Sequence, residues 1–361
     1  MKILKGLFIL LNMLAVALLL LSTLAGKIPP SQSEWVSLFS YGYFLLLLLN
    51  VTFALLWLLA SSKWFLLSTA AIFLRFSFVP LFFQLGGNQE LGRHLEDDEI
   101  IVMTYNVHNF MGRNFASAMD GNLSQMDSNA RQFLDIVDSI QPLMMFLQEF
   151  VPVCHNTGVA DSLKTRGYKY TMSASFNMDT YGTVIFSRQP LEAPIHIDSS
   201  ECFAVDMLHN GDTLRLINLH LESYKLDEVD YQRFNATRHG AMAMDSLHGT
   251  IAKLRQASLV HEQEWKRIAP LIESSPYPCV MAGDFNDTPA SYFYQNAKLH
   301  LLDSYKECGK GFGTTYHGNF PAFRIDYVMH SQVLQAHSYR RLKSDISDHF
   351  PIAVKLKVPA Q

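Results

Sequence analysis

The sequence predicts an α/β protein in which an apolar helical region at the N-terminus precedes one large domain of mixed strands and helices. Three observations predict this arrangement. Residues 1–86 are mostly apolar, as in a membrane region. After residue 99, short apolar runs of strand length alternate with longer segments that show helical spacing. Most of the short runs lead into polar side chains, and loops that follow strands are where functional groups gather.

The apolar region contains three runs that we interpret as transmembrane helices, at residues 4–25, 41–60 and 64–85. Each is close to the roughly 20 residues that a helix needs to cross a bilayer. The third run contains Arg75 and Pro80, so a re-entrant or interfacial helix is an alternative for it. A secretory signal peptide is an alternative for the first run, although its apolar core exceeds the ~7–15 residues usual there.

The few charges in the short loops predict a topology. Lys2 and Lys5 precede the first run, Lys63 lies between the second and third, and Lys27 lies alone between the first and second. The positive-inside rule therefore puts the N-terminus in the cytoplasm. We expect a multi-pass integral membrane protein. Three spans put the rest of the chain on the outer (periplasmic or extracytoplasmic) face, whereas two spans return it to the cytoplasm.

The remaining chain divides into a linker and one domain. Residues 87–99 begin with a glycine and end in an acidic run, which is typical of a linker. Residues 100–361 have the size of one large domain. Residues 1–99 contain as many acidic as basic side chains, so the formal net charge of −4 belongs to this domain. A domain that grips long nucleic acid usually shows a basic excess, and the totals contain none.

All four cysteines lie in the large domain, at Cys154, Cys202, Cys279 and Cys308. No C-x-x-C pair occurs among them, so their spacing matches no zinc-binding pattern. Buried or free thiols are the simplest interpretation. Disulfides stay open as an alternative if the domain lies outside the cytoplasm.

The strands and helices of the domain are predicted from the period of their apolar residues. The nearly continuous apolar run at 100–107 predicts a strand buried on both faces. Four apolar side chains at helical spacing predict the helix at 129–140, which Pro142 closes. The pair Asn210-Gly211 predicts the tight turn of a hairpin. In chain order the expected elements are a strand at 100–107, a helix at 129–140, strands at 143–149 and 182–188, a hairpin at 202–223, a helical segment at 225–272, and strands at 279–284, 324–331 and 351–358.

Polar side chains follow these strands in six motifs, which are TYNVHNF at 104–110, LQEF at 147–150, NLHLES at 218–223, GDFNDTP at 283–289, RIDY at 324–327 and SDHFP at 347–351. Together the motifs resemble the endonuclease/exonuclease/phosphatase superfamily, which includes deoxyribonucleases, neutral sphingomyelinases and inositol polyphosphate 5-phosphatases. The resemblance covers residues 100–358. It implies a four-layer α/β sandwich, with two face-to-face sheets flanked by helices, and the activity of a metal-dependent phosphoric ester hydrolase.

The motifs supply candidate metal ligands. Glu149 ends an apolar run, and a carboxylate at a strand end is the natural first ligand for Mg²⁺, which prefers few carboxylates and keeps several waters. The resemblance implies the same role, with Mn²⁺ as a substitute ion. We expect Asn106 to hold the metal shell or the phosphate, and Asp348 to lie near the metal, as a ligand or through water.

The motifs also supply candidate catalytic residues. Asp284 and Asn286 lie two apart on an extended segment, so both side chains face the same way and can hold a water for in-line attack. The resemblance implies that Asp284 orients the nucleophile and that Asn286 contacts it and the phosphate. It also pairs His349 with Asp326, which favours the imidazolium that stabilises the charged transition state.

His220 is the second candidate histidine, which we expect to touch a phosphate oxygen or the leaving group. The sequence names no carboxylate partner for it. Tyr181 and Asn218 are candidate substrate contacts. His317 lies shortly before Asp326 and is a candidate substrate contact only. Asp287 is interpreted as a turn residue.

The leading hypothesis is a membrane-anchored, Mg²⁺-dependent phosphoesterase whose substrate is a phospholipid headgroup or a small phosphate ester. An endonuclease or exonuclease that acts on DNA or RNA is the alternative within the enzyme class. A catalytically silent relative that binds phosphorylated ligands is the alternative outside it, which the complete set of polar residues disfavours. We infer the bilayer and the phosphate ester as partners, and no obligate protein partner.

Overall fold

The computed structural model describes residues 2–92, 95–112, 123–150, 157–174, 182–197, 201–224, 244–318 and 323–359. The chain forms two compact units. The first contains Met1–Phe83, Ser223–Gln263 and Asp287–Leu299, and the second contains Gln84–Glu222, Glu264–Asn286 and His300–Gln361. The family motifs therefore fall almost entirely in the second unit.

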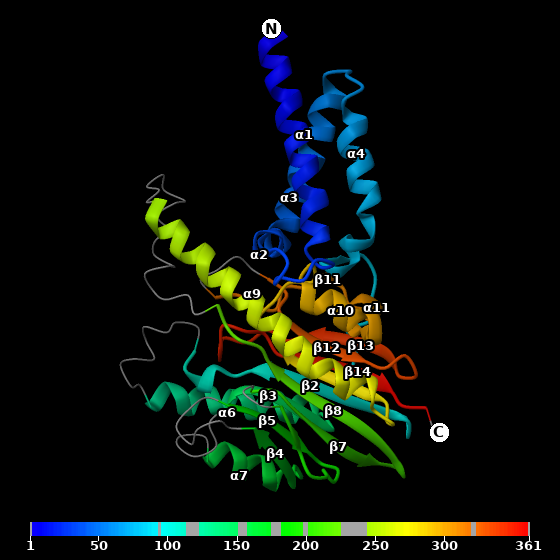
Figure 1. Cartoon of the computed structure of the whole chain (residues 1–361). Coiled ribbons are helices and arrows are strands. Elements are labelled where there is room, and N and C mark those ends of the chain that lie inside the picture. Colours follow the sequence, from blue (N-terminus) through cyan, green and yellow to red (C-terminus); the bar gives the residue numbers. More distant parts are fainter. Residues whose placement is uncertain are drawn as a thin grey trace. The chain divides into compact units, whose positions relative to one another are not determined.

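The first unit is built around apolar helices that lie side by side (Figure 1). They are α1 (Lys2–Leu24), the short α2 (Glu34–Ser37) and η1 (Leu38–Gly42), α3 (Tyr43–Leu59) and α4 (Phe65–Leu74). Leu4, Leu59 and Phe73 leave 72%, 82% and 82% of their surfaces exposed. Exposed apolar surface on this scale costs free energy in water.

Two of these helical stretches are long and apolar enough to cross a membrane, Lys2–Leu24 and Glu34–Leu59. The third expected run, at residues 64–85, contains a ten-residue α-helix, α4, followed by the 3₁₀ helix η2 (Phe76–Leu81). Pro80 lies in η2, and proline removes a backbone donor and disfavours a continued α-helix. By length, α4 alone falls short of a bilayer.

The second unit contains two six-stranded sheets. The first has the strand order β13-β14-β2-β3-β5-β4, and the second has the order β10-β12-β9-β8-β7-β6. The strands of the first sheet are β2 (Glu99–Asn106), β3 (Met144–Phe150), β4 (Tyr170–Ala174), β5 (Gly182–Ser187), β13 (Gln335–Arg341) and β14 (Ile352–Lys357). Those of the second are β6 (Ile195–His196), β7 (Phe203–His209), β8 (Asp212–His220), β9 (Cys279–Asp284), β10 (Leu302–Asp303) and β12 (Asp326–His330). The short strands β1 (Phe83–Gln84) and β11 (Gly311–Phe312) lie outside these sheets.

The two sheets pack face to face through one apolar core. Val102 and Phe146 of the first sheet lie in the same buried cluster as Leu216, Val280 and Val328 of the second. A second cluster packs α6 (Leu123–Ile140) and α7 (Thr157–Thr165) on the other face of the first sheet. The predicted α/β sandwich of two sheets flanked by helices is confirmed.

The remaining helices are α9 (Met244–Glu273), α10 (Tyr292–His300), α11 (Ser304–Cys308) and the 3₁₀ helix η3 (His108–Phe110). The C-terminal part of α9 buries Trp265 and Ile268, and the Leu271 carbonyl accepts a hydrogen bond of 3.4 Å from Arg215 of β8. The beginning of the predicted helical segment, at 225–243, lies outside the described residues.

Most predicted elements of the domain match the observed ones. The hairpin is β7 and β8, and its turn residues Asn210 and Gly211 have φ angles of 52° and 92°. Helix α6 begins before the predicted residue 129. Within the expected linker, the Asn88 carbonyl accepts hydrogen bonds from the Tyr339 backbone N–H and the Ser338 hydroxyl, and Leu91 is buried against Ile101.

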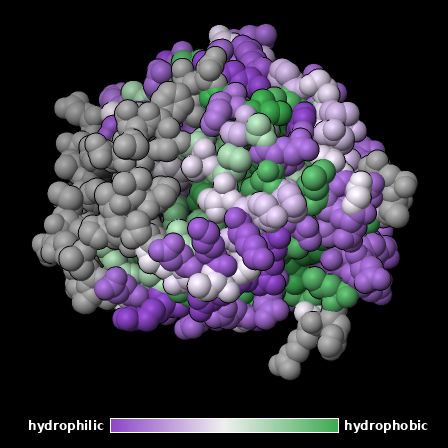
Figure 2. Space-filling model, turned by 90° about the horizontal axis from the view of Figure 1, so that it is seen from below, coloured by the Kyte–Doolittle hydropathy of each residue, from purple (hydrophilic) through white to green (hydrophobic). Residues whose placement is uncertain are grey.

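The surface shown in Figure 2 is mainly hydrophilic, and its hydrophobic residues lie in small groups. Such a surface is ordinary for a water-exposed domain. Cys202, Cys279 and Cys308 are buried and form no disulfide with one another, and Cys154 lies outside the described residues.

Candidate active site

The strand register brings the motif ends together at one edge of the sandwich. In the second sheet, His220 at the end of β8 lies beside Asp284 at the end of the parallel strand β9. Asp326, the first residue of β12, pairs with Asp284 from the other side. In the first sheet, Asn106 at the end of β2 lies beside Gln148 of the parallel strand β3, one residue before Glu149. Parallel neighbours end at the same edge, which is why distant motifs converge.

Asn106 connects the two sheets of the site. Its amide nitrogen donates to Glu149 Oε1 at 2.9 Å and to Asp284 Oδ2 at 3.1 Å. Its side-chain oxygen accepts from the His108 backbone N–H at 3.0 Å. Asn106 is buried, and this fully engaged amide holds two carboxylates near one another.

Glu149 reaches the site from an irregular strand end. Its φ is 52°, and the pairing of β3 with β5 shifts register between Leu147 and Phe150. A bulge of this kind re-aims a side chain. Burial opposes ionisation of Glu149, but the nearby His108 and His220 and the Asn106 amide outweigh it, so the pKa of Glu149 falls below its ordinary value.

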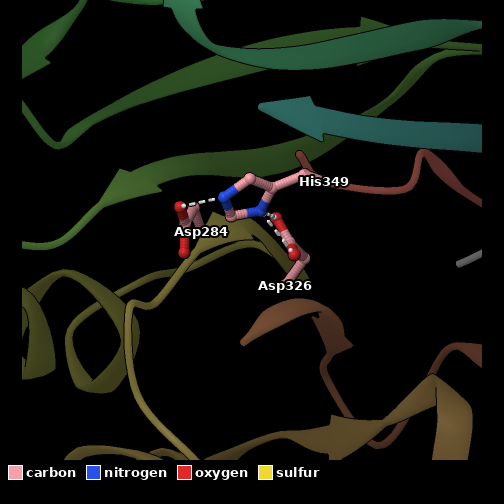
Figure 3. Close-up of side chains that lie close together, drawn as sticks. All are labelled: Asp284, Asp326 and His349. Carbon is pink, nitrogen blue, oxygen red and sulfur yellow. Dashed lines mark hydrogen bonds and ion pairs between the residues drawn. The ribbon is translucent and has the colours of Figure 1, made fainter. Parts of the chain in front are cut away.

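His349 lies between two carboxylates (Figure 3). Its Nδ1 is 2.9 Å and 3.1 Å from the two oxygens of Asp326, and its Nε2 is 3.6 Å from Asp284 Oδ2. Burial alone would favour the neutral ring, but the charges of Asp326 and Asp284 outweigh it and raise the pKa of His349 well above its ordinary value. The geometry is that of an imidazolium held by Asp326.

Asp284 is fully buried at the centre of the site. Burial, partly offset by the His349 charge and reinforced by Asp326, raises the pKa of Asp284 to about 6. A carboxylate with such a pKa can accept a proton near neutral pH. The ligand atoms of Asp284, Asp326 and His349 also lie within 4.8 Å of one another. Each ring nitrogen of His349 lies next to a carboxylate oxygen of this cluster.

His220 has a carboxylate partner that the sequence did not reveal. Its Nδ1 is 2.6 Å from Glu201 Oε2, and its Nε2 is 3.7 Å from Glu149 Oε1. Burial favours the neutral ring, but the hydrogen bond to Glu201 and the charges of Glu149 and Asp284 outweigh it and raise the pKa of His220 to about 9. Glu201 lies two residues before β7, and the pairing of β7 with β8 brings it next to His220. The predicted hairpin was therefore the one sequence feature that pointed to Glu201.

Asn286 turns the chain after β9. Its φ is 47°, and its backbone N–H donates to Asp284 Oδ1 at 2.8 Å. Its side-chain amide donates to the Leu221 carbonyl at 2.9 Å. Asparagine tolerates this left-handed conformation better than most residues. The turn therefore fixes Asp284 and Asn286 relative to each other.

Asp348 and His108 lie at the rim of the site. Their closest side-chain atoms, His108 Nδ1 and Asp348 Oδ1, are 3.8 Å apart, and the Asp348 side chain is 22% exposed. His108 Nδ1 also lies 3.1 Å from the Gly112 carbonyl oxygen. The charge of His108 contributes to the lowered pKa of Glu149.

Asn218 and Gln148 lie beneath the site and are fully buried. Asn218 donates to the carbonyls of Leu147 and Val184 at 3.3 Å and 3.0 Å, and accepts from Gln148 at 2.8 Å. These bonds join the second sheet to the first. Every polar atom of the Asn218 side chain is engaged with protein atoms, which fits a supporting role for this predicted substrate contact.

Three further residues were named from the sequence. Tyr181 lies outside the described residues. The ring of His317 stacks on the Phe350 ring, with 3.9 Å between the ring centroids. The His317 backbone N–H donates to the Asp348 backbone carbonyl. Tyr316, which the sequence did not single out, meets the His349 ring edge-on at 5.2 Å. Asp287 belongs to the first unit, where its carboxylate is 3.1 Å from His261 Nδ1.

Comparison with known proteins identifies the family of the chain. The sequence model of the Endonuclease/Exonuclease/phosphatase family matches residues 103–349, a range that includes the first five motifs in full and the sixth as far as His349. The chain belongs to this family. As a member it is a metal-dependent phosphoric ester hydrolase of the phosphodiesterase and nuclease class. A second family model, described only as a domain of unknown function, matches residues 5–82.

Solved structures share the fold of this family member. The catalytic domain of human Nocturnin, with a bound sulfate anion, is 16% identical, has a TM-score of 0.51, and is covered over 96% of its length by 73% of this chain. A family protein from Bacteroides thetaiotaomicron is 15% identical with a TM-score of 0.51, covering 73% of this chain and 99% of that one. These identities show the fold alone. A search of curated proteins gives no match.

Proposed function

We propose that the protein is a Mg²⁺-dependent phosphoesterase that hydrolyses a phosphodiester, or a phosphomonoester, by in-line attack of water. One observation carries this proposal. A single amide, Asn106, joins Glu149 to Asp284, and a protonated histidine lies beside each carboxylate. The site thus combines a candidate metal ligand, a candidate base and two cations that suit a phosphate.

Glu149 and Asp348 would hold the metal, because their carboxylate side chains are partly exposed, at 24% and 22%, and Mg²⁺ prefers oxygen donors. Asn106 would act by orienting Glu149, since its oxygen already accepts a hydrogen bond. A bound Mg²⁺ supplies neutralisation of the phosphate charge and polarisation of the phosphoryl oxygen, and Mn²⁺ can substitute for it. The preference for Mg²⁺ follows from the donor set.

Asp284 would hold and deprotonate the attacking water. Its raised pKa, about 6, suits a general base near neutral pH. Asn286 would contact the water and the phosphate from the turn that fixes it beside Asp284. Asp326 keeps His349 protonated, and Glu201 does the same for His220. The two imidazolium rings would stabilise the charge that develops on the phosphoryl and leaving-group oxygens.

The substrate class we favour is a phospholipid headgroup or another small phosphate ester. The large domain carries a net charge of −4 and lacks the basic excess of proteins that grip long nucleic acid. The apolar helices would also keep the site near a lipid surface. Nuclease activity on DNA or RNA is an explicit outcome of the test below.

The test is a substrate panel with the purified full-length chain in detergent and Mg²⁺. The panel contains sphingomyelin, inositol phosphates, a phosphodiester dye, RNA and DNA. Asp284→Asn is the inactive control, and Asp161→Asn, at an exposed position of α7, is the matched control. We expect turnover of a small or lipid ester by the wild type and Asp161→Asn alone. Turnover that is confined to DNA or RNA would replace the proposed substrate class, and activity that survives in Asp284→Asn would refute the proposed base.

We further propose that the chain is an integral membrane protein with three parts, a membrane region at 1–86, a linker at 87–99 and a catalytic domain at 100–361. The supporting observations are two helical stretches of membrane-spanning length and their exposed apolar side chains. With three spans, the domain would face the outer side. A reporter fused after residue 361 would then be active only outside the cytoplasm, and activity in the cytoplasm would favour two spans.

A further inference from the structure

The third apolar run of the first unit breaks at a cation. Helix α4 ends at Leu74, and the 3₁₀ helix η2 begins at Phe76, so Arg75 lies between them. The Arg75 N–H donates to the Ala71 carbonyl at 3.2 Å, and the Arg75 carbonyl accepts from the Tyr43 hydroxyl at 3.2 Å. These bonds give Arg75 a defined place among the apolar helices.

Contacts with α1 show how far along the helices Arg75 lies. The Ser68 hydroxyl of α4 donates to Asn12 Oδ1, near the middle of α1, at 2.6 Å. About one turn further along α4, Ala71 shares a buried cluster with Leu19 of α1. The two helices therefore run in the same direction, and Arg75, one more turn along, lies near the level at which α1 ends. In a bilayer, the end of a spanning helix lies at the level of the lipid headgroups.

The Arg75 side chain is a cation among apolar neighbours. Phe73 and Phe76, on either side of it in the chain, leave 82% and 58% of their surfaces exposed. Glu34 is the only acidic side chain in residues 1–83, and it accepts from Arg255 Nε at 2.8 Å. The Arg75 Nε is buried and has no hydrogen-bond partner among the residues that the structure describes. A cation on an apolar, lipid-facing surface costs free energy unless an anion pairs with it.

A second cation of the first unit lies beside the same break. The Phe78 N–H donates to the Arg75 carbonyl at 3.0 Å, and Lys298 Nζ of α10 lies 5.8 Å from the centroid of the Phe78 ring. Lys298 also donates to Gln295 Oε1 at 2.8 Å. The adjacent Leu299 leaves 71% of its surface exposed. Basic and aromatic side chains next to exposed apolar ones are typical of a surface at the level of lipid headgroups.

We infer that Arg75 and Lys298 bind the phosphate of an anionic lipid headgroup. A guanidinium presents a planar fork of N–H groups that fits phosphate oxygens, and an ammonium adds a second positive charge. A lipid is the occupant that fits, because its acyl chains cover the exposed apolar side chains while its phosphate pairs with the cations. A free phosphate would leave that apolar surface in water. The inference rests on the proposed membrane region and needs none of the proposed catalytic chemistry.

The test measures lipid binding by the full-length chain in an uncharged detergent, with EDTA present so that no Mg²⁺-dependent turnover consumes the lipid. The probes are phosphatidylglycerol, phosphatidylcholine and diacylglycerol of one short chain length, and inorganic phosphate. Native mass spectrometry gives the Kd of each probe. We expect phosphatidylglycerol to bind about 10-fold more tightly than phosphatidylcholine, whose choline already compensates the phosphate charge, and more tightly still than diacylglycerol, which has no phosphate.

Variants assign this preference to the two cations. Arg75→Gln should abolish it, whereas Lys63→Gln, at the exposed cation before the other end of α4, should keep it. Arg75→Lys should keep part of it, because the charge remains while the planar fork is lost. Lys298→Gln should weaken the binding of phosphatidylglycerol by about 3-fold.

Each contrary outcome has its own meaning. Equal Kd values for phosphatidylglycerol in the wild type and Arg75→Gln, or no preference for this lipid in the wild type, would refute the inference. Inorganic phosphate that binds as tightly as the lipid would refute a lipid as the occupant. A chain that stays monodisperse in water without detergent would refute the proposed membrane region and this site with it, whereas a lack of hydrolysis would affect only the proposed function. Should Arg75→Gln not fold, unchanged binding in both Arg75→Lys and Lys298→Gln would refute the inference.

Discussion

The two histidine–carboxylate pairs of the site differ in how the fold holds them. His349 lies just before β14 of the first sheet, and its partner Asp326 lies on β12 of the second, so the pair is fixed by both sheets and is buried. His220 and Glu201 belong to neighbouring chain segments of the second sheet alone, and their side chains are 13% and 32% exposed. The first pair is preorganised by the framework, whereas the second can adjust and exchange protons with solvent. We therefore propose that His349 stabilises the charge of the transition state and that His220 acts on the leaving group.

The largest effect is expected at the buried pair. His349→Ala should lower kcat/KM by about 100- to 10,000-fold, because it removes a charge aimed at the transition state. The double variant with Asp326→Ala should be little worse, since residues that act as one unit are strongly non-additive. Asp326→Asn alone should cost less than His349→Ala. The measurement is kcat/KM on one diester, with folding checked by circular dichroism and His196→Ala as the exposed control. Additive losses would show that the two residues act independently.

His220→Ala should have the next largest effect, about 100-fold in kcat/KM for a poor leaving group. If His220 protonates or shields the leaving oxygen, the loss should shrink as the leaving group becomes more acidic. A series of aryl phosphodiesters measures this dependence. An equal loss across the series would instead assign His220 to the phosphoryl oxygens.

Glu201→Gln should lower kcat/KM less, by about 10-fold. Positioning partners of this kind typically contribute 10- to 100-fold, and water can replace a partly exposed carboxylate. Its effect should vanish in the His220→Ala background. If Glu201→Gln lowers kcat/KM as much as His349→Ala does, the proposed difference between the two histidine–carboxylate pairs is wrong.

The smallest effect on activity is expected beneath the site. Asn218→Ala leaves the carbonyls of Leu147 and Val184 without a buried donor, which should lower the free energy of unfolding by about 1–3 kcal/mol. Activity of the folded protein should fall only slightly. Thermal unfolding and kcat/KM separate the two effects, and a large rise in KM with unchanged stability would restore Asn218 as a substrate contact.

The sequence predicted those site residues that end or begin strands. Glu149, His220, Asp284 and Asp326 all lie at strand ends, because apolar runs mark the strands and the motifs mark their edges. The α/β sandwich followed from the same pattern together with the family resemblance. A local pattern carries this information because strand ends are defined by the residues around them.

A local sequence pattern could not predict the contacts that depend on how strands and sheets pair. Glu201 is 19 positions from His220 and belongs to no motif, and only the pairing of β7 with β8 brings it close. Gln148 and Asn218 meet because the two sheets face each other. The length of α4 was equally hard to predict, since Arg75 and Pro80 can lie within an apolar run or end its helix.

The central claim is that Glu149 binds the metal on which hydrolysis depends. Its most direct test is Mg²⁺-dependent turnover by the wild type, by Glu149→Gln and by Glu273→Gln, which makes the same change at a side chain that is 54% exposed on α9. We expect Glu149→Gln to keep its fold and lose at least about 100-fold in activity at any Mg²⁺ concentration, while Glu273→Gln matches the wild type. Ca²⁺ should support less turnover than Mg²⁺, because its looser coordination orients the phosphate less well. Near wild-type turnover by Glu149→Gln would contradict the account.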